Sequence, residues 1–242
     1  MRDSKWQHQK DLHGFTPVEL ARLLGKREIE KLLVLKKPLT IKTILKGETA
    51  PKLIGIKEFE EQFLVTYRPF LTFDSYEALK EAVAYCPLSF RYQWIFGKRD
   101  DWEAYYQELM LHGFLEKSLV KWISEEMGYG LFAECNLDKG AFIGEYTGLF
   151  QPIIEPNAYC FEYPHRLFSK RRFMIDAEKN GNLVRFINHS ENPNLEPLWL
   201  YDRGILHLIL IARYPILKGE EFFFDYGVDY WQFRTQKPIK NV

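Results

Sequence analysis

Apolar residues recur at helical spacing through the first part of the chain. Residues 11–37, DLHGFTPVELARLLGKREIEKLLVLKK, carry two such runs that break at Gly25. Proline at position 17 predicts the start of the first helix, because proline at the first helical position loses no hydrogen bond. Residues 99–113, RDDWEAYYQELMLHG, place aromatic and aliphatic residues on adjoining turns and end in a glycine. This pattern predicts a largely helical N-terminal region.

A further helix is predicted between these two stretches. Asp74 precedes the run SYEALKEAVAYC, and Glu77 stands three residues after it. An acidic residue followed at this spacing by glutamate forms the capping-box pattern, which satisfies the free amides of a helix N-terminus. We therefore predict a helix that begins after Asp74.

The pattern changes after about residue 115, where short apolar runs of the β type replace helical spacing. These runs are SLVKWI, AFIGEY, AYCFEY, FMIDA, ILHLILIARY and EFFFDY. Turn signals separate them, namely Asn180-Gly181, Asn192-Pro193 and Lys218-Gly219. Strands and helices do not alternate, which disfavours a doubly wound parallel sheet. We predict an α+β protein with a helical region over residues 1–115 and a β-rich domain over 116–242.

Composition limits the class of protein. The chain has 242 residues, of which 46% are apolar, so it can form a sizeable core. Its 33 basic and 33 acidic residues give a net charge of zero, which argues against bulk electrostatic binding to nucleic acid or to a membrane. Three scattered cysteines without C-x-x-C spacing indicate reduced thiols in an intracellular compartment. No stretch has the apolar length of a signal peptide or a membrane span.

The first helical stretch resembles an ankyrin repeat over about residues 11–36. It follows the pattern D-x-x-G-x-T-P-L-H-x-A, with Val18 and Glu19 in place of the usual leucine and histidine. One repeat cannot bury its own apolar face, so it must pack on neighbouring elements. A plain helical hairpin is the alternative interpretation, and the sequence leaves both open.

Residues 128–133, GYGLFA, satisfy the dinucleotide-binding pattern G-x-G-x-x-A. That pattern requires a helix to open directly after the glycines. The residues that follow, ECNLDKGAFIGEY, contain a turn and then β-type residues, so no helix can begin there. We exclude a dinucleotide site on this ground.

Four stretches in a fixed order indicate a different fold. GYGLFA is followed by GAFIGEYTG, then IDAEKNGNLVRFINHSENPN, then KGEEFFFDYG. This series, over about residues 117–232, resembles the SET domain of protein-lysine methyltransferases, and is most similar to the small SET proteins of chlamydiae and related bacteria. The resemblance implies a β-clip of short strands with a knot-like C-terminal crossing, S-adenosylmethionine as cofactor, and transfer of a methyl group to a lysine.

The resemblance also implies roles for single residues. Tyr226 and Tyr146 would be the catalytic tyrosines, which wall a narrow channel and align the amine. Phe224 stands at the position where tyrosine limits transfer to one methyl group, so phenylalanine implies di- or trimethylation. The cofactor-binding residues implied are Gly128, Tyr129, Gly130, Tyr159, Arg185, Asn188, His189 and Trp231.

Within that set, the glycines would let the main chain approach the cofactor closely, because they lack Cβ. Tyr129 would lie along the methionine end, and Arg185 would support the pocket. Asn188 would bind the methionyl amino group. The main chain of His189 would contact the adenine, while its imidazole is a satisfied core group.

Asn188-His189-Ser190 also matches the glycosylation signal N-x-S, which we interpret as accidental because the cysteine pattern and the lack of a signal peptide indicate an intracellular protein. Many SET proteins bind zinc around the domain, but the tail here, GVDYWQFRTQKPIKNV, has no cysteine, and we predict no metal. Trp231 and Phe233 are then the candidates to cover the adenine, since aromatic faces stack on purines. Packing at the domain edge is the alternative for both.

The expected partner is a protein that presents a lysine, either a histone tail or a histone-like protein. We expect no direct contact with nucleic acid or membrane, and the sequence is compatible with a homodimer. The expected location is intracellular, in a bacterial cytoplasm or, for an exported effector, in a host nucleus. Two other functions stay open: a SET-shaped interaction module without catalysis, and an unrelated β-rich adaptor.

Overall fold

The computed structural model describes residues 9–29, 39–90, 117–155, 157–164, 170–227 and 230. The helices that lie wholly within these residues are α1 (Pro17–Leu23), α3 (Ile56–Phe63), α4 (Tyr76–Tyr85) and the 3₁₀ helix η2 (Leu183–Phe186). In the same residues, no helix has the length and hydropathy to cross a membrane.

Short strands supply most of the architecture. In the N-terminal half they are β1 (Thr40–Ile44), β2 (Lys52–Gly55) and β3 (Thr66–Tyr67). In the C-terminal half they are β4 (Ser118–Ser124), β5 (Gly128–Ala133), β6 (Phe142–Glu145), β7 (Leu149–Pro152), β8 (Cys160–Tyr163), β9 (Phe173–Asp176), β10 (Asn180–Gly181), β11 (Asn188–His189), β12 (Leu195–Asp202), β13 (Ile205–Ala212) and β14 (Phe223–Phe224). The predicted α+β class is confirmed, and strands dominate the domain after residue 116.

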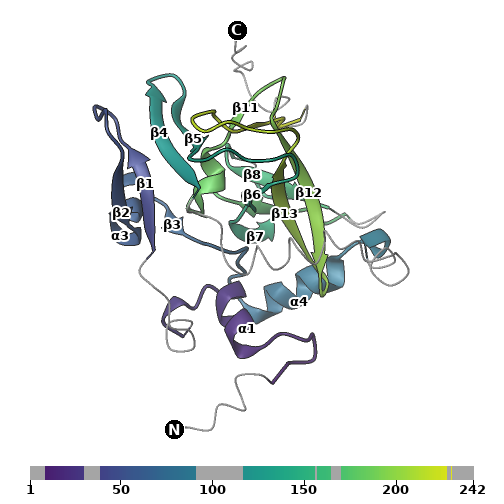
Figure 1. Ribbon diagram of the computed structural model, residues 1–242. Helices are drawn as coiled ribbons and strands as arrows, with labels where there is room; N and C mark the ends of the chain where they lie inside the picture. The colour runs from purple at the N-terminus through teal and green to yellow at the C-terminus, as the bar shows by residue number, and fades with distance from the viewer. Residues whose placement is uncertain are drawn as a thin grey trace.

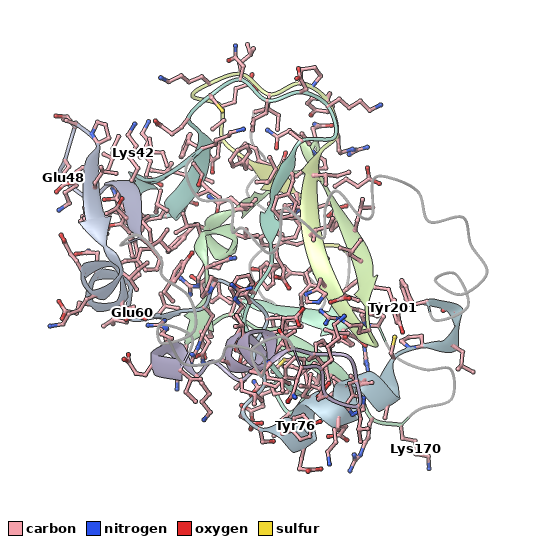
Figure 2. The ribbon with its side chains drawn as sticks, turned by 60° about the horizontal axis from the view of Figure 1, so that its bottom comes forward. Lys42, Glu48, Glu60, Tyr76, Lys170 and Tyr201 are labelled. Atoms are coloured by element: carbon pink, nitrogen blue, oxygen red, sulfur yellow. The ribbon has the colours of Figure 1, made fainter. Side chains whose placement is uncertain are left out.

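The strands form several small sheets rather than one large sheet. Three of them have the orders β2-β1-β4-β5, β12-β13-β6 and β7-β9-β8, and two further pairs are β10-β3 and β11-β14. Figure 1 shows α1 and α4 lying against the end of the β12–β13 hairpin, with β1, β2 and α3 grouped at one side. Figure 2 shows Lys42, Glu48 and Glu60 on that side, away from Tyr76 of α4.

Helix α1 begins where the sequence predicts. Thr16 is its N-cap, and the side chain of Thr16 accepts a hydrogen bond from the amide of Glu19. In return, Glu19 accepts from the amide of Thr16 at 2.7 Å, which completes a capping box. Gly25 follows the helix with a φ of +60°, a conformation that glycine adopts without a steric penalty.

Helix α4 begins one residue later than predicted. Its N-cap is Ser75 and not Asp74, because the Ser75 hydroxyl accepts the amide hydrogen of Ala78 at 3.1 Å. Aspartate and serine are both favourable N-caps, so two adjacent candidates could not be separated by type alone. The helix predicted within residues 99–113 lies outside the described residues.

The prediction of a helical region over residues 1–115 is wrong for the stretch that contains β1 and β2. Strand β1, TIKTI, alternates buried and more exposed residues, and its β-branched side chains favour a strand. It pairs antiparallel with β2 and parallel with β4. One sheet therefore spans both halves of the chain, across the predicted boundary at residue 115.

The Asn180-Gly181 signal also has a different outcome from the predicted turn. These two residues form β10, which pairs in parallel with Thr66 and Tyr67 of β3. Space is tight here, since a Cβ on Gly181 would lie 3.3 Å from both the Ala177 Cβ and the Arg185 Cδ. The N-terminal half thus packs directly on the segment that leads into the candidate site.

Candidate functional site

The C-terminal segment crosses between two earlier parts of the chain. On one side, β14 pairs in parallel with β11, so that Phe224 faces His189 across the pair. On the other side, the amide of Phe222 donates to the carbonyl of Leu131 in β5 at 2.8 Å. Asn194 adds a side-chain clamp, because its amide group donates to the Glu221 carbonyl at 2.7 Å. The predicted crossing is therefore present, and it lies beside the Asn-His pair.

The crossing places Tyr226 against the residues around Asn188. Its hydroxyl donates to the carbonyl of Ile187 at 2.8 Å, and its amide donates to Nδ1 of His189 at 3.2 Å. The His189 ring packs 5.3 Å from the Tyr226 ring, and its side chain is 10% exposed. The imidazole is therefore a satisfied core group, as predicted, and it helps to hold Tyr226 in place.

Tyr146 approaches the same region from the end of β6. Its side chain is buried, and its hydroxyl donates to the carbonyl of Tyr159 at 2.7 Å. Burial, and then the proximity of Tyr226, hold the pKa of Tyr146 well above its ordinary value. The Tyr146 hydroxyl therefore stays protonated and acts as a hydrogen-bond donor.

A small hollow of about 30 Å³ lies between these tyrosines. Its described lining residues are Tyr146, Ala158, Tyr159, Cys160, Phe161, Arg185, Ile187, Phe224, Tyr226 and Tyr230. The Tyr226 ring lies 4.7 Å from Phe224 and 4.4 Å from Tyr230. The structure therefore brings the predicted residues Tyr226, Tyr146 and Phe224 together around one aromatic cavity.

Arg185 gives this hollow a positive wall. Its Nε donates to the Ala177 carbonyl at 2.9 Å, and one terminal nitrogen donates to the Glu178 carbonyl at 3.2 Å. The guanidinium carbon lies 4.0 Å from the centre of the Tyr159 ring, which is a cation–π contact. These contacts fix Arg185 and Tyr159 against each other at the wall of the hollow.

Asn188 lies beside β5 and the start of the crossing segment. Its side-chain amide donates to Oε1 of Glu221 at 2.8 Å and to the Tyr129 carbonyl at 3.3 Å. A Cβ on Gly130 would lie 2.5 Å from the same Glu221 oxygen, so only glycine admits this carboxylate without displacement. Gly128 has a φ of +73°, which also favours glycine.

Glu221 is a site residue that sequence reasoning did not single out. Burial raises the pKa of Glu221, although the hydrogen bond from Asn188 and the charge of Lys121 act in the opposite direction. The one sequence signal for Glu221 is its place as the first residue of EFFFDY, a stretch whose motif points to its tyrosine. Tyr230 also lines the hollow, although the sequence pattern favours its neighbour Trp231 as the aromatic cover.

Tyr129 contributes its main chain to the site, whereas its ring packs elsewhere. The ring lies 4.9 Å from Phe63 and 5.0 Å from Trp122, and the hydroxyl accepts from the amide of Lys46. Only the carbonyl of Tyr129 meets Asn188. The predicted placement of Trp231 lies outside the described residues.

The structure also bears on two other kinds of ligand site, a dinucleotide-binding turn and a metal site. GYGLFA forms strand β5, which pairs antiparallel with β4, so the glycines do not open a phosphate-binding helix. The exclusion of a dinucleotide turn is therefore confirmed. Among the described residues, no group of three or more His, Cys, Asp or Glu side chains could hold a metal ion.

Part of the chain that contains this geometry is similar to known proteins. Residues 128–227 match the family model described as the SET domain. This range contains the crossing, both glycines of GYGLFA, Asn188, and the tyrosines Tyr146 and Tyr226 that line the hollow. Over these residues the chain is similar to the SET domain, which agrees with the predicted fold class.

Relatives of known activity share this part of the chain. It is 39% identical over 129 residues to "Histone-lysine N-methyltransferase, H3 lysine-36 specific" of Candida albicans, which covers 49% of this chain and 15% of that protein. It is 34% identical over 131 residues to "N-lysine methyltransferase KMT5A-A" of Danio rerio, which covers 49% of this chain and 38% of that protein. The chain thus spans well under half the length of these relatives.

One solved structure is also similar to this chain over part of its length. The crystal structure of KRYPTONITE in complex with mCHH DNA, H3(1-15) peptide and SAH shares 26% identity, covers 50% of this chain and 26% of that chain, and has a TM-score of 0.40.

Proposed function

We propose that this protein is an S-adenosylmethionine-dependent protein-lysine N-methyltransferase. The observation that carries the proposal is the convergence of Tyr146 and Tyr226 on one aromatic hollow, directly beside Asn188. The relatives reported above are named as lysine methyltransferases, which supports the same activity here. The hollow would admit the target lysine, and the region of Asn188 would hold the cofactor.

The side chains beside β5 fit a cationic cofactor. S-adenosylmethionine carries a positive sulfonium and an ammonium group, and when bound it supplies the methyl group. The amide nitrogen of Asn188 donates to Glu221 and to the Tyr129 carbonyl, which leaves its Oδ1 to accept from an ammonium. The Glu221 carboxylate lies beside Gly130, where its charge would favour a cation. Residues Gly130, Asn188 and Glu221 would therefore hold this group.

The hollow favours a neutral amine. Lysine in water is protonated at neutral pH, with an ordinary pKa of about 10.4. The described lining of the hollow is aromatic and carries no carboxylate, and Arg185 adds a positive charge at its wall. Desolvation and repulsion by a like charge both lower the pKa of an amine that enters. The lining therefore promotes loss of the proton that blocks nucleophilic attack.

Positioning would provide most of the rate increase. Tyr226 and Tyr146 are both held by hydrogen bonds to main-chain carbonyls, so their rings form fixed walls. Holding two reactants at attack distance converts a bimolecular step into an effectively unimolecular one. Because both hydroxyls donate to carbonyls, we assign the two tyrosines to orientation and exclusion of water rather than to proton abstraction.

Phe224 supports a product with more than one methyl group. Its ring lies 4.7 Å from Tyr226 and 6.4 Å from Phe161, and it lines the hollow without adding a hydroxyl. A tyrosine in this place would introduce a polar group that holds water beside the amine. We therefore extend the proposal to di- or trimethylation.

The proposed substrate is a histone or a histone-like protein with an accessible lysine. Support comes from the names of the relatives, which include histone H3 lysine-36 enzymes. An ankyrin-like segment over residues 11–36, similarity to chlamydial SET proteins and a location inside bacterial or host cells stay predictions. In this proposal the N-terminal half would also serve as a platform for the substrate protein.

One experiment tests the proposal as a whole. S-adenosylmethionine is titrated into the full chain by calorimetry, and the protein is then incubated with the labelled cofactor and a panel of core histones and bacterial DNA-binding proteins. Mass spectrometry locates each modified residue, and substrates with that lysine replaced by arginine serve as controls. Saturable binding with transfer to a lysine is expected. Binding without transfer to any protein in the panel would instead support a non-catalytic interaction module.

A further inference from the structure

A buried ion pair lies on the other side of the strand that carries Tyr146. Oε1 of Glu145 is 2.6 Å from Nδ1 of His207, and the two side chains are 5% and 10% exposed. Neither residue lines the aromatic hollow, and the proposed chemistry uses neither. A charged pair is costly to bury, so its presence beside Tyr146 requires a physical explanation.

The pair is coupled to Tyr146 through the main chain. Glu145 and Tyr146 are consecutive, and successive side chains of an extended chain point to opposite faces. The amide of Tyr146 donates to the carbonyl of Leu208 at 2.7 Å, directly after His207. Two neighbouring contacts with β13 therefore hold the chain where it leaves β6 and place Tyr146. One joins the side chains of Glu145 and His207, and the other joins the main chains of Tyr146 and Leu208.

The Glu145 main chain also connects to the cofactor side of the site. Its carbonyl accepts a hydrogen bond from the side-chain amide of Asn182 at 2.8 Å. The side-chain oxygen Oδ1 of Asn182 accepts a hydrogen bond from the main-chain amide of Val184 and so caps η2. Helix η2 ends directly before Ile187, the residue that accepts from Tyr226. A shift of Glu145 would therefore disturb both channel tyrosines.

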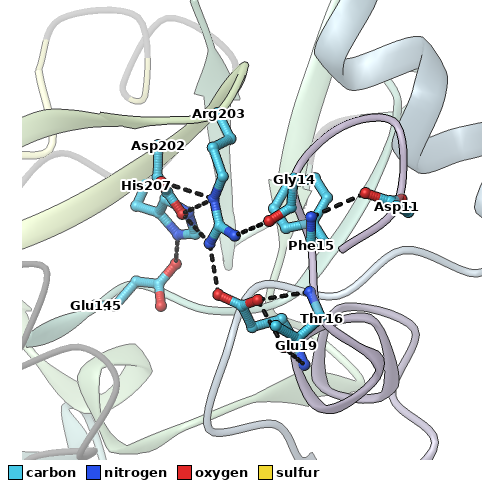
Figure 3. Close-up of polar contacts among 9 residues, drawn as sticks. All are labelled: Asp11, Gly14, Phe15, Thr16, Glu19, Glu145, Asp202, Arg203 and His207. Atoms are coloured by element: carbon cyan, nitrogen blue, oxygen red, sulfur yellow. Dashed lines mark hydrogen bonds and ion pairs between the residues drawn. The ribbon is translucent and has the colours of Figure 1, made fainter. Parts of the chain in front are cut away.

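Residues 11–23 are called the N-terminal segment here. On its outer side, the ion pair faces a cavity of about 140 Å³, which the N-terminal segment closes. The cavity is lined by Glu145, His207, Asp202 and Arg203 from the SET domain and by Phe15, Glu19 and Arg22 from the segment. Figure 3 shows Arg203 between the two parts, directed toward Glu19 and Gly14. The N-terminal segment thus forms the outer wall behind the pair.

Arg203 makes the connection, and it does so from a strained main-chain conformation. It occupies the first position of the two-residue turn between β12 and β13, with a φ of +49°. Asparagine or glycine is the usual residue there, because arginine rarely adopts positive φ. Its guanidinium donates to the Gly14 carbonyl at 2.8 Å and to Glu19 at 2.7 Å. Such strain persists only where surrounding contacts maintain it, and it is frequent at functional positions.

The charge of His207 depends on the groups around it. Burial lowers the pKa of His207, but the charge and hydrogen bond of Glu145 and the charge of Asp202 outweigh it and raise the pKa above its ordinary value. The positive charge of Arg203 opposes this increase in the pKa of His207. The carboxylates of Asp202 and Glu19 pair with Arg203 and so weaken the effect of its charge on His207. The remaining charged group at this cavity is Arg22 of α1.

We propose that Glu145 and His207 are positioning residues for Tyr146, and that the N-terminal segment supports them by docking Glu19 on Arg203. The proposal rests on the proposed function, since it assigns Tyr146 to the methyl-transfer channel. It gives the N-terminal segment a role in activity through the interior of the SET domain, in addition to any contact with substrate.

The central variant is Arg203→Asn in the full chain. Asparagine adopts positive φ more readily than arginine, so the turn itself is not weakened, but the contacts to Gly14 and Glu19 are lost. Arg213→Asn, at an exposed arginine beyond the other end of β13, is the matched control. Hydrogen exchange of the peptide that covers residues 142–147 reports on the Tyr146 amide, and it needs no activity. The rate of methyl transfer in a single turnover and the affinity for S-adenosylhomocysteine, by calorimetry, are measured on the same proteins.

We expect faster exchange at residues 142–147 in Arg203→Asn, methyl transfer reduced about tenfold by misplacement of Tyr146, and cofactor affinity within about twofold of wild type. Glu145→Gln, which keeps a hydrogen bond to His207, should lose less transfer than Glu145→Ala. Unchanged exchange at 142–147 in Arg203→Asn overturns this proposal, whatever the activity. Wild-type protein that transfers no methyl group would instead contradict the proposed function, and the exchange result would still decide the role of Arg203.

Discussion

The hydroxyl of Tyr226 donates a hydrogen bond of 2.8 Å to the carbonyl of Ile187. This contact joins the C-terminal segment to the residue directly before Asn188, although the two partners are 39 positions apart in the chain. The proposed cofactor region and the proposed lysine channel consequently share a wall.

Removal of the Tyr226 hydroxyl should reduce the rate of methyl transfer. In Tyr226→Phe the ring remains, but the hydrogen bond to Ile187 is lost and the wall of the hollow is free to move. We expect the single-turnover rate to fall by about tenfold or more, because misplacement of a reacting group has large effects. Tyr214→Phe, at an exposed tyrosine that donates to the Pro193 carbonyl, is the matched control and should keep the wild-type rate. Equal rates for both variants would remove Tyr226 from the mechanism.

Replacement of Phe224 should change the product rather than the rate alone. Phe224→Tyr adds a hydroxyl at the wall of a hollow of about 30 Å³, so less room remains for a methylated amine. We expect wild type to accumulate di- or trimethyl-lysine and the variant to stop mainly at monomethyl-lysine. Mass spectrometry after exhaustive reaction measures the distribution. A wild-type protein that stops at one methyl group would show this interpretation of Phe224 to be wrong.

The Glu221 carboxylate should favour cofactor binding at a cost to stability. Its pKa is raised mainly by burial, so its ionised form is less favourable in the folded protein than in the unfolded chain. The raised pKa stabilises the fold at low pH, and this contribution disappears as pH rises through the folded pKa. Glu221→Gln removes the ionisation and should leave the cofactor-free protein at least as stable at pH 7. Its affinity for S-adenosylmethionine should fall about tenfold, as expected for loss of one charge-assisted contact.

Thermal denaturation and calorimetry measure the two effects of Glu221→Gln separately. The neighbouring Glu220→Gln is the control, because Glu220 accepts from the amide of Leu217 on the exposed turn. Unchanged cofactor affinity in Glu221→Gln would show that this carboxylate does not face the cation.

Stability should depend on pH through His207. Its pKa is raised in the folded state despite burial, so the contribution of the protonated ring is complete below the unfolded value of about 6.5. That contribution should diminish as pH rises through the folded pKa. We therefore expect the stability difference between wild type and His207→Gln to be larger at pH 6 than at pH 9. Denaturant unfolding at both values measures it, with His13→Gln as control, and a difference that increases with pH would contradict the account.

Gly148 should be intolerant of a side chain for reasons of space. A Cβ there would lie 2.3 Å from the carbonyl oxygen of Asp176, a main-chain atom that cannot move aside independently. We expect Gly148→Ala to destabilise the fold by about 1–3 kcal/mol, the usual range for overpacking. Gly55→Ala is the control, because no heavy atom lies within 4 Å of its added Cβ. Comparable midpoints in urea for the two variants would contradict this packing.

The sequence predicts much of the fold where local signals are strong. Thr16, Pro17 and Glu19 determine the start of α1, and the apolar runs after residue 116 predict most of the strands that follow. The sequence does not separate Asp74 from Ser75 as N-cap, since both residue types can accept the helix amides. Strand β1 was missed because a run of five residues carries too little periodicity to compete with the helical pattern around it.

The candidate site likewise contains some residues that the sequence predicts and others that it does not. Tyr226, Tyr146 and Asn188 were predicted because each lies in a motif of several residues. The pairing of Glu145 with His207 could not be predicted, since it joins residues 62 positions apart that have no shared local pattern. Arg203 gives no sequence signal for its positive φ, because arginine is not a usual residue at this turn position. Its contacts with Gly14 and Glu19 also join residues 189 and 184 positions apart.

The most direct test of the central claim is a crystal structure of the full chain with S-adenosylhomocysteine and a lysine peptide taken from a protein that it methylates. We predict that the cofactor product contacts Gly130, Asn188 and Glu221, and that the lysine side chain enters the hollow between Tyr146 and Tyr226. Electron density for the cofactor product away from Asn188, or a lysine that reaches it without passing these two tyrosines, would contradict the account.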